Sequence, residues 1–263
     1  MQIPLLILAN GESWLERFVP FTMFHIATVA VCAAAMLGAC WLGRKWHPHV
    51  KERKFRLVWG WAVLIYQTWY VVWYALPSRW DWKESLPLQL CDLAAFVAGM
   101  AMVTQWHRWR TLLYFWGIGL STQAFLTPTL DLGIMHTKFW LFWVGHTAIV
   151  GSAVYDVVVR GFRPRARDLG FAILFTSYGV LLVFYFNVLL TDLVKEPISY
   201  WYVGPSKPEK PTIIDELGPW PLRVLWLSGI VICDFILLWA VWPALRKLTG
   251  GRDPVATAAV GND

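Results

Sequence analysis

The side chains with the greatest chemical capacity in this chain are those of Cys91 and His146, and both lie inside long apolar stretches. A thiolate is a strong nucleophile, and a nearby imidazole is the usual base that generates it. A third polar group normally orients the imidazole. Four further residues in the apolar stretches are candidates to bind or orient a substrate: His25, Gln89, Gln123 and Asn187.

Asp92 is a further candidate for orienting the imidazole, because it is adjacent to Cys91. Consecutive residues of a helix point about 100° apart, so Asp92 could instead face the membrane interface. Spacing alone is a weak signal, because a buried cysteine is most often an inert small hydrophobe. A lone intramembrane histidine is often no more than a hydrogen bond between helices.

The composition is that of a membrane protein. Hydrophobic residues make up 57% of the 263 residues, charged residues only 15%, and there are 19 Trp. These values are far from those of a typical soluble domain. The net charge of +6 fits basic loops beside anionic lipid headgroups, so we expect no nucleic-acid partner.

Seven apolar stretches are long enough to cross a bilayer, which takes roughly 20 residues. The predicted fold is therefore all-α, a polytopic bundle of seven transmembrane helices within residues 18–248. The fourth stretch is the shortest and could be tilted or partly re-entrant. The predicted spans are Phe18–Trp41, Leu57–Leu76, Leu86–Trp106, Thr111–Thr127, Phe139–Val159, Leu169–Leu190 and Leu222–Leu245.

The distribution of Lys and Arg predicts the orientation of these spans. Most of the 23 basic residues follow the first, third, fifth and seventh spans, and short positive loops stay in the cytoplasm. We therefore expect an extracytoplasmic segment at residues 1–17 with no signal peptide. We also expect a cytoplasmic, disordered tail at residues 249–263.

With this orientation, the candidate residues fall at similar depths. His25, Cys91 and His146 lie about five to seven residues below the outer ends of their spans, which is about 7–10 Å at the rise of a helix. Gln123 and Asn187 lie about four residues from theirs. Polar groups at one depth in hydrocarbon indicate a functional site, and its depth suits the ester bonds of phospholipids.

The cysteines indicate neither a disulfide nor a metal site. All of them lie inside predicted spans, away from the outer loops where oxidation would pair them. No Cys or His spacing is typical of a zinc site, and we expect no metal and no cofactor. The four cysteines are Cys32, Cys40, Cys91 and Cys233.

Two other features carry open alternatives. Asp234, near the middle of the last span, is either protonated or hydrogen-bonded to a neighbouring helix, or it serves as a proton or ion site. The connection at residues 191–221 is rich in proline. It is either a lid over the site or a disordered connector.

Several short motifs accompany Cys91 and His146. Together they resemble the YwaF-type family of bacterial integral membrane proteins, over residues 21–242. The motifs are Phe21-Thr22 with His25, Leu86-Pro87-Leu88-Gln89-Leu90-Cys91, Phe115-Trp116-Gly117, Gln123-Ala124 with Thr127-Pro128, Asn187, and Asp215-Glu216-Leu217-Gly218-Pro219-Trp220-Pro221.

This resemblance implies an activity and a location. Animal relatives of the family are described as membrane acyltransferases that act on phospholipids through a Cys and a His, and the matching positions are Cys91 and His146. The implied location is the bacterial cytoplasmic membrane. Two departures bear on the substrate, because many relatives have His where this chain has Gln89 and an Asn-Tyr pair after the residue matching Asn187.

Three classes of function remain open. The first is an enzyme that modifies lipids, with a phospholipid or lysophospholipid as substrate and with either transfer or hydrolysis as the outcome. The second is a transporter or binding protein for a small solute, in which Asp234 matters more than Cys91. The third is a membrane scaffold without catalytic activity. The sequence does not determine the oligomeric state.

Overall fold

The computed structural model describes residues 15–205 and 213–248. The predicted extracytoplasmic segment at residues 1–17 falls mostly outside these ranges, and the predicted tail at residues 249–263 falls wholly outside them. Within them the fold is all-α, as predicted. An isolated β-bridge between Arg17 and Leu132 is the only β pairing in the part of the chain that is described.

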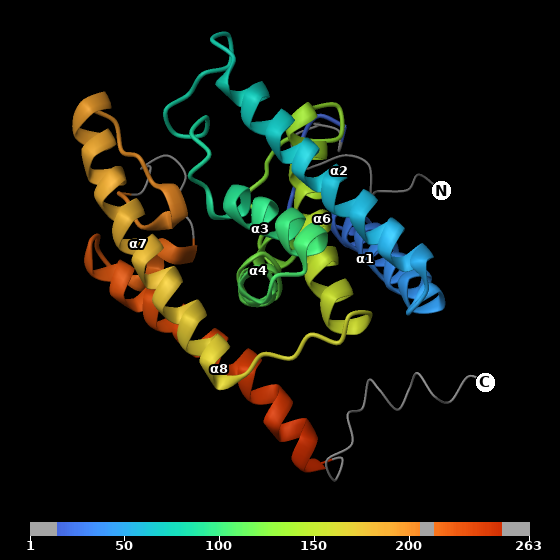
Figure 1. Ribbon diagram of the computed structural model, residues 1–263. Helices are drawn as coiled ribbons and strands as arrows, with labels where there is room; N and C mark the ends of the chain where they lie inside the picture. The colour runs from blue at the N-terminus through green and yellow to red at the C-terminus, as the bar shows by residue number, and fades with distance from the viewer. Residues whose placement is uncertain (1–14, 206–212, 249–263) are drawn as a thin grey trace.

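The longer helices overlap the predicted spans, and shorter helical elements lie between them (Figure 1). The elements are α1 (Met23–Trp46), α2 (Val50–Ala75), α3 (Leu90–Thr104), α4 (His107–Leu112), the π-helix η1 (Leu113–Leu120), α5 (Gln123–Leu126), α6 (Thr137–Val158), α7 (Ala166–Val194), the 3₁₀ helices η2 (Tyr200–Tyr202) and η3 (Ile213–Leu217), and α8 (Leu222–Leu248).

Four of these helices are long and apolar enough to cross a membrane: α1, α6, α7 and α8. Of the seven predicted spans, four therefore correspond to helices that could cross a membrane. Helix α3 has 15 residues, fewer than the roughly 17 that a span needs. Helix α2 has 26 residues, but its first two turns are charged and the rest is rich in Trp and Tyr.

The predicted span at residues 111–127 is not a continuous helix. It is divided into the end of α4, the π-helix η1 and the four-residue helix α5. A methyl group added at Gly117 of η1 would come within 2.7 Å of Ala153 in α6, so the two backbones lie in close contact there. The wider turn of a π-helix, often seen at functional sites, lies beside the centre of the bundle.

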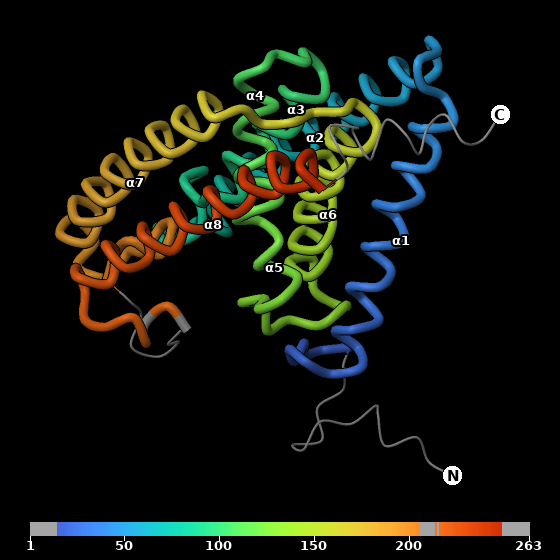
Figure 2. The backbone as a smooth tube through the Cα atoms, turned by 90° about the horizontal axis from the view of Figure 1, so that it is seen from below, coloured from blue at the N-terminus to red at the C-terminus, as the bar shows by residue number. Residues whose placement is uncertain are grey.

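Helix α6 occupies the centre of the molecule, with α1 on one side and α3 and η1 on the other (Figure 2). Half of its most apolar window is buried in the protein, against 22% for α1 and α7 and 11% for α8. The three peripheral helices therefore present most of their apolar surface outward. Such surface belongs against lipid rather than water.

Glycines bring α2 and α3 into close contact. A methyl group at Gly60 would lie 2.8 Å from Val103, and one at Gly99 would lie 2.5 Å from Leu64. Small residues that allow backbones to approach are the common device of helix packing in membranes. Helix α3 thus packs closely against α2 and also contacts α6.

Candidate functional site

Cys91 lies in the first turn of α3, which begins at Leu90 after the N-cap residue Gln89. Its side chain is half-buried and its thiol is free. The backbone N–H groups of Cys91 and Asp92 face the sulfur. Because the first N–H groups of a helix have no partner within the helix, this position stabilises negative charge on a side chain.

The residues around Cys91 come mainly from α2. The Gln67 amide donates a hydrogen bond to Asp92 over 3.4 Å, and the backbone N–H of Gln89 faces the same carboxylate. Asp92 is 5% exposed, so it faces the protein interior and not the membrane interface. We call Gln67, Tyr66, Tyr70, Cys91 and Asp92 the thiol cluster.

The two tyrosines of the thiol cluster lie close enough to Cys91 for their hydroxyls to interact with it electrostatically. Sequence reasoning did not name Gln67, Tyr66 or Tyr70. Gln67 is the one strongly polar residue in the predicted span at residues 57–76, and that was a usable signal. The tyrosines gave none, because aromatic residues are common throughout α2.

His146 lies in α6 and is half-buried. Its Nδ1 is 2.8 Å from the carbonyl oxygen of Phe142, and its ring packs against the Phe142 ring with centroids 4.4 Å apart. A carbonyl only accepts, so Nδ1 carries the proton and Nε2 has a free lone pair. No group in the described residues is hydrogen-bonded to Nε2. This tautomer is the one a general base needs.

Cys91 and His146 are not hydrogen-bonded to each other in the described structure. Tyr66 links their surroundings. Its hydroxyl donates to the carbonyl of Leu141 in α6 over 2.8 Å. The same hydroxyl lies 3.5 Å from where a methyl group on Gly145 would be. The thiol and the residue preceding His146 therefore share a neighbour.

His25 is placed quite differently. Its side chain is 5% exposed and both ring nitrogens have partners. Nδ1 accepts from the backbone N–H of Phe21 over 3.0 Å, so Nε2 carries the proton and donates to the carbonyl of Phe125 over 3.1 Å. His25 therefore fastens α1 to α5 and has no lone pair to spare.

Asn187 is fully buried in α7 and holds the connection to α8. Its amide donates to the carbonyl of Tyr200 and accepts from the N–H of the same residue, both over 2.9 Å. The hydroxyl of Tyr200 then donates to the carbonyl of Trp82. Burial raises the pKa of Tyr200 to about 12, which keeps this donor protonated.

The described part of the connection after α7, residues 195–205, packs into the protein. Ile198, Tyr200, Trp201 and Val203 are buried, the first two completely. Trp201 and Tyr202 have positive φ angles of 56° and 60°, a conformation that costs energy for residues other than glycine.

Gln123, the remaining candidate, begins α5 with an exposed side chain, and the structure does not bring it to the thiol cluster.

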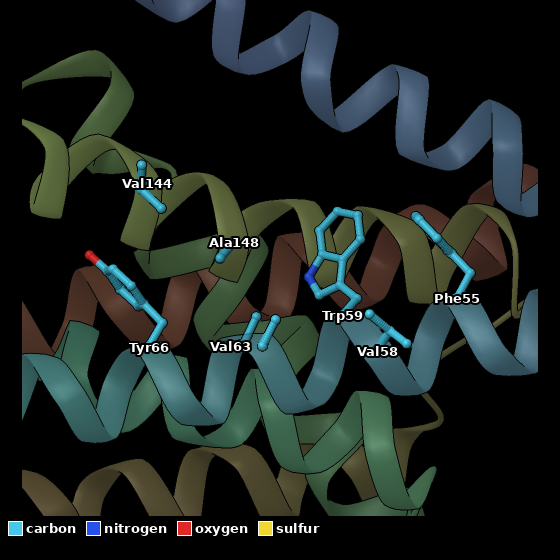
Figure 3. A pocket seen from close by; sticks show the side chains of 8 residues that line it. Phe55, Val58, Trp59, Val63, Tyr66, Val144 and Ala148 are labelled. Carbon is cyan, nitrogen blue, oxygen red and sulfur yellow. The ribbon is translucent and has the colours of Figure 1, made fainter.

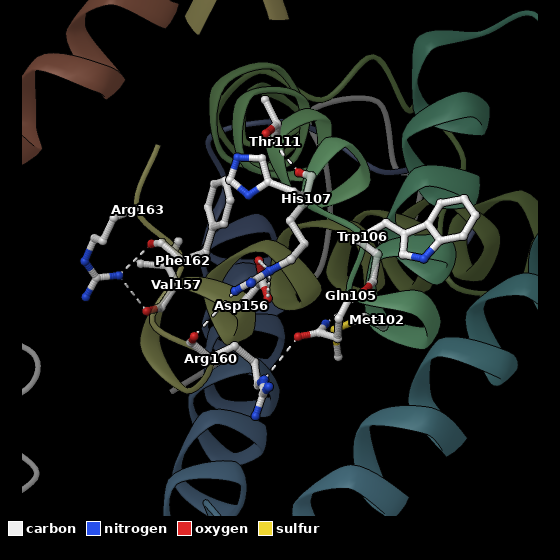
Figure 4. A network of polar contacts seen from close by, with 12 residues as sticks. Met102, Gln105, Trp106, His107, Thr111, Asp156, Val157, Arg160, Phe162 and Arg163 are labelled. Carbon is white, nitrogen blue, oxygen red and sulfur yellow. Dashed lines mark hydrogen bonds and ion pairs between the residues drawn. The ribbon is translucent and has the colours of Figure 1, made fainter. Parts of the chain in front are cut away.

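A second group of polar residues lies at the opposite ends of α2, α3 and α6 (Figure 4). Arg110 Nε donates to both Asp156 oxygens, over 3.0 and 2.9 Å. Glu52 accepts from Tyr155 over 3.1 Å and pairs with Arg160 and Arg56. We call Glu52, Arg56, Arg110, Asp156 and Arg160 the charged cluster.

Arg160 links the charged cluster to the end of α3, because it donates to the C-cap residue Gln105 over 3.1 Å. Nearby, His107 in α4 bonds with Asp168 over 2.7 Å. Asp168 also caps the first turn of α7. Glu52 and Asp156 are 3% and 2% exposed. Each carboxylate is therefore paired, as buried charges must be.

Two further observations concern metals and ions. No three His, Cys, Asp or Glu side chains in the described ranges are grouped so that they could hold a metal ion. Asp234 in α8 lies against η1, where a methyl group at Gly119 would come within 2.5 Å of its Oδ2. That oxygen is buried and has no hydrogen-bond partner within residues 15–205 and 213–248.

The fold and composition define a multi-pass α-helical membrane protein. The model of the TMEM164 family matches residues 20–239, so the chain belongs to that family. The assignment to the YwaF-type family is therefore wrong, since the short motifs behind it did not separate the two. The bacterial cytoplasmic membrane, expected from that resemblance, is left without support. No curated protein and no solved structure matches the chain.

Proposed function

We propose that this protein is a thiol-dependent membrane enzyme that transfers acyl groups from phospholipids, with Cys91 as nucleophile and His146 as base. The observation that carries the proposal is the tautomer of His146. Its Nδ1–H is held by Phe142, while Nε2 is left as an unpaired acceptor. An imidazole in this state can take a proton from a thiol.

The proposed reaction has two half-reactions. Cys91 gives its proton to Nε2 of His146, and the thiolate attacks the ester carbonyl carbon of a phospholipid. The C–S bond forms as the ester C–O bond breaks, and the departing oxygen takes the proton from His146. The hydroxyl of a lysophospholipid, or water, then gives its proton to Nε2 and attacks the thioester, and the sulfur leaves and is reprotonated by His146.

This chemistry needs the sulfur and Nε2 to approach within hydrogen-bond reach. Such bonds are often long or poorly aligned until a substrate is bound. The position of Cys91 supports its role independently, because the N–H groups of Cys91 and Asp92 face the sulfur. These donors offset part of the cost of burying a thiolate beside the Asp92 carboxylate.

The proposed topology places the thiol cluster in the outer half of the membrane. It keeps all seven predicted spans, with the amino terminus outside and the carboxyl terminus in the cytoplasm. The short helix α3 then enters from the outer side and brings Cys91 close to the headgroups. The charged cluster lies at the cytoplasmic side, beside the basic loops.

The test uses purified protein in vesicles that contain a phospholipid with a labelled acyl chain and an unlabelled lysophospholipid. Transfer of the label is measured by mass spectrometry. We expect Cys91→Ser to abolish transfer and His146→Gln to slow it by about 10²–10⁴-fold. Cys233→Ser is the matched control, because Cys233 is exposed on α8. Full transfer by Cys91→Ser would end the proposal.

A solute transporter is the second candidate, favoured by the unpartnered Oδ2 of Asp234 beside η1. A buried carboxylate without a partner inside a membrane is a common feature of proton and ion pathways. In that case solute flux would survive Cys91→Ala and be lost in Asp234→Asn. If the protein is the proposed enzyme, acyl transfer would instead be lost in Cys91→Ala and would survive in Asp234→Asn.

A further inference from the structure

A groove of about 380 Å³ runs between α2 and α6 (Figure 3). It exists because both helices pack on α3 while touching each other over only a short length. The groove is open along its side, so a ligand can enter from the surrounding bilayer. Its lining consists of Phe55, Val58, Trp59, Ala62, Val63, Tyr66, Val144 and Ala148.

The lining is apolar except at one end. The α2 residues that line the groove occupy one face of the helix from Phe55 to Tyr66. Tyr66 supplies the only hydroxyl of the lining. A pocket with no polar groups along its walls selects a ligand that is itself apolar over most of its length.

The size of the groove matches one long hydrocarbon chain. Eleven residues of helix rise about 16 Å, the length of an extended chain of about 13 carbons. A methylene group occupies about the volume of a water molecule in the liquid, about 30 Å³, so the groove of about 380 Å³ also holds about 13 of them. Length and volume agree.

The two ends of the groove are chemically different. At one end Phe55 and Trp59 pack against each other and against Tyr155, with ring centroids 5.7–6.1 Å apart. At the other end the Tyr66 hydroxyl donates to the carbonyl of Leu141 and lies beside Gly145, the residue before His146. A chain in the groove would therefore have one end against an aromatic cluster and the other end beside the helix turn that carries His146.

We propose that the groove between α2 and α6 binds the acyl chain that Cys91 transfers. The inference rests on the proposed function and adds to it the place and the length limit of the substrate chain. In the proposed topology the chain runs from the thiol cluster towards the membrane centre, the direction of a lipid tail. The finite length of the groove therefore limits the chain length that it accepts.

Ala62 is the position at which the groove is most easily filled. It lies on the lining face of α2, and its small side chain is exposed to the groove and the bilayer. A larger side chain there would occupy the space of several methylenes. Ile65 on the same helix is 67% exposed and does not line the groove, so Ile65→Phe is a matched control.

The binding experiment uses vesicles of phosphatidylcholine whose acyl chain carries a photoreactive diazirine. After illumination, cross-links are mapped by mass spectrometry. We expect them to concentrate on residues 55–66 and 144–148, and to fall at least five-fold there in Ala62→Phe but not in Ile65→Phe. Cross-links spread evenly over α1, α7 and α8 as well would overturn the inference, since the groove would then hold only bulk lipid.

A second measurement concerns chain length. We expect Ala62→Phe to reduce the transfer of 16-carbon chains at least ten-fold relative to 8-carbon chains. Ala62→Leu should have a smaller effect in the same direction, and melting curves confirm that both variants fold. An unchanged preference in both folded variants would contradict the inference.

The two proposals fail in different ways. Cys91→Ser should lose transfer and keep the cross-links in the groove. If the groove is labelled but Cys91→Ser transfers normally, the lipid site stands and the proposed enzyme does not. If Cys91→Ser loses transfer while labelling ignores the groove, the enzyme stands and the chain lies elsewhere.

Discussion

The charged cluster and the thiol cluster differ in how much of their hydrogen-bonding capacity is used. In the charged cluster, Asp156 accepts two bonds from Arg110 and Glu52 is bound by three partners. At the other end of the same helices, the free thiol of Cys91 and Nε2 of His146 have no hydrogen bond to each other or to a side chain in the described part of the chain.

This difference suits two roles, one in holding the helices in place and one in reacting with a substrate. Buried carboxylates that are paired, as Glu52 and Asp156 are, fix the positions of helices and are not available to a substrate. Groups with an unused lone pair, held in place by neighbours, are those that can accept a proton or attack a carbon. The two histidines differ in the same way. Both ring nitrogens of His25 are hydrogen-bonded, whereas only Nδ1 of His146 is.

The largest effect on stability is expected at Asp156. Asp156→Ala leaves Arg110 without its buried partner, which costs about 3–5 kcal/mol. Thermal unfolding in detergent measures this loss. Asp192→Ala is the control, because Asp192 and its partner Lys195 are both exposed, and no change is expected. A variant of Asp156 that is stable but inactive would show that the charged cluster takes part in the reaction and does more than hold the helices together.

The two histidines should respond in opposite ways. His25→Leu leaves the N–H of Phe21 and the carbonyl of Phe125 unpaired, which costs about 1–3 kcal/mol of stability. Transfer per folded molecule should persist. His146→Gln should keep the unfolding temperature and lose transfer. Measurements of unfolding and of transfer on both variants check these expectations. Equal loss of transfer in the two variants would contradict the assignment of different roles to His25 and His146.

The smallest effect is expected at Tyr66. Tyr66→Phe removes the hydrogen bond to Leu141, and bonds between helices in membranes contribute about 0.6 kcal/mol on average. The apolar ring still lines the groove, so chain-length preference should be retained. A large fall in transfer with unchanged stability would show instead that the hydroxyl takes part in the reaction.

Much of the fold could be predicted from apolar periods and lengths. The predicted spans at residues 18–41, 139–159, 169–190 and 222–245 correspond to α1, α6, α7 and α8. The span at residues 111–127 was wrong as a continuous helix. Its apolar composition does not reveal the π-helix, which packs closely on α6 at Gly117.

The roles of the polar residues depended on partners that are distant in sequence. His25, Asn187 and His146 look alike as lone polar residues in apolar stretches, and we gave all three a role at the site. Asn187 is hydrogen-bonded to Tyr200, thirteen residues later, and His25 is hydrogen-bonded to Phe125, a hundred residues later. The local sequence around each residue does not predict these hydrogen bonds.

The sequence by itself determined that this is a helical membrane protein with polar side chains buried in it, because composition and length alone govern whether a segment prefers lipid to water. It also pointed to Cys91 and His146 as candidates for a catalytic pair. Only the tertiary structure decided which buried polar groups are already satisfied and that a groove lies between α2 and α6. Both properties arise from contacts between helices, and those contacts follow from packing geometry that no single segment contains.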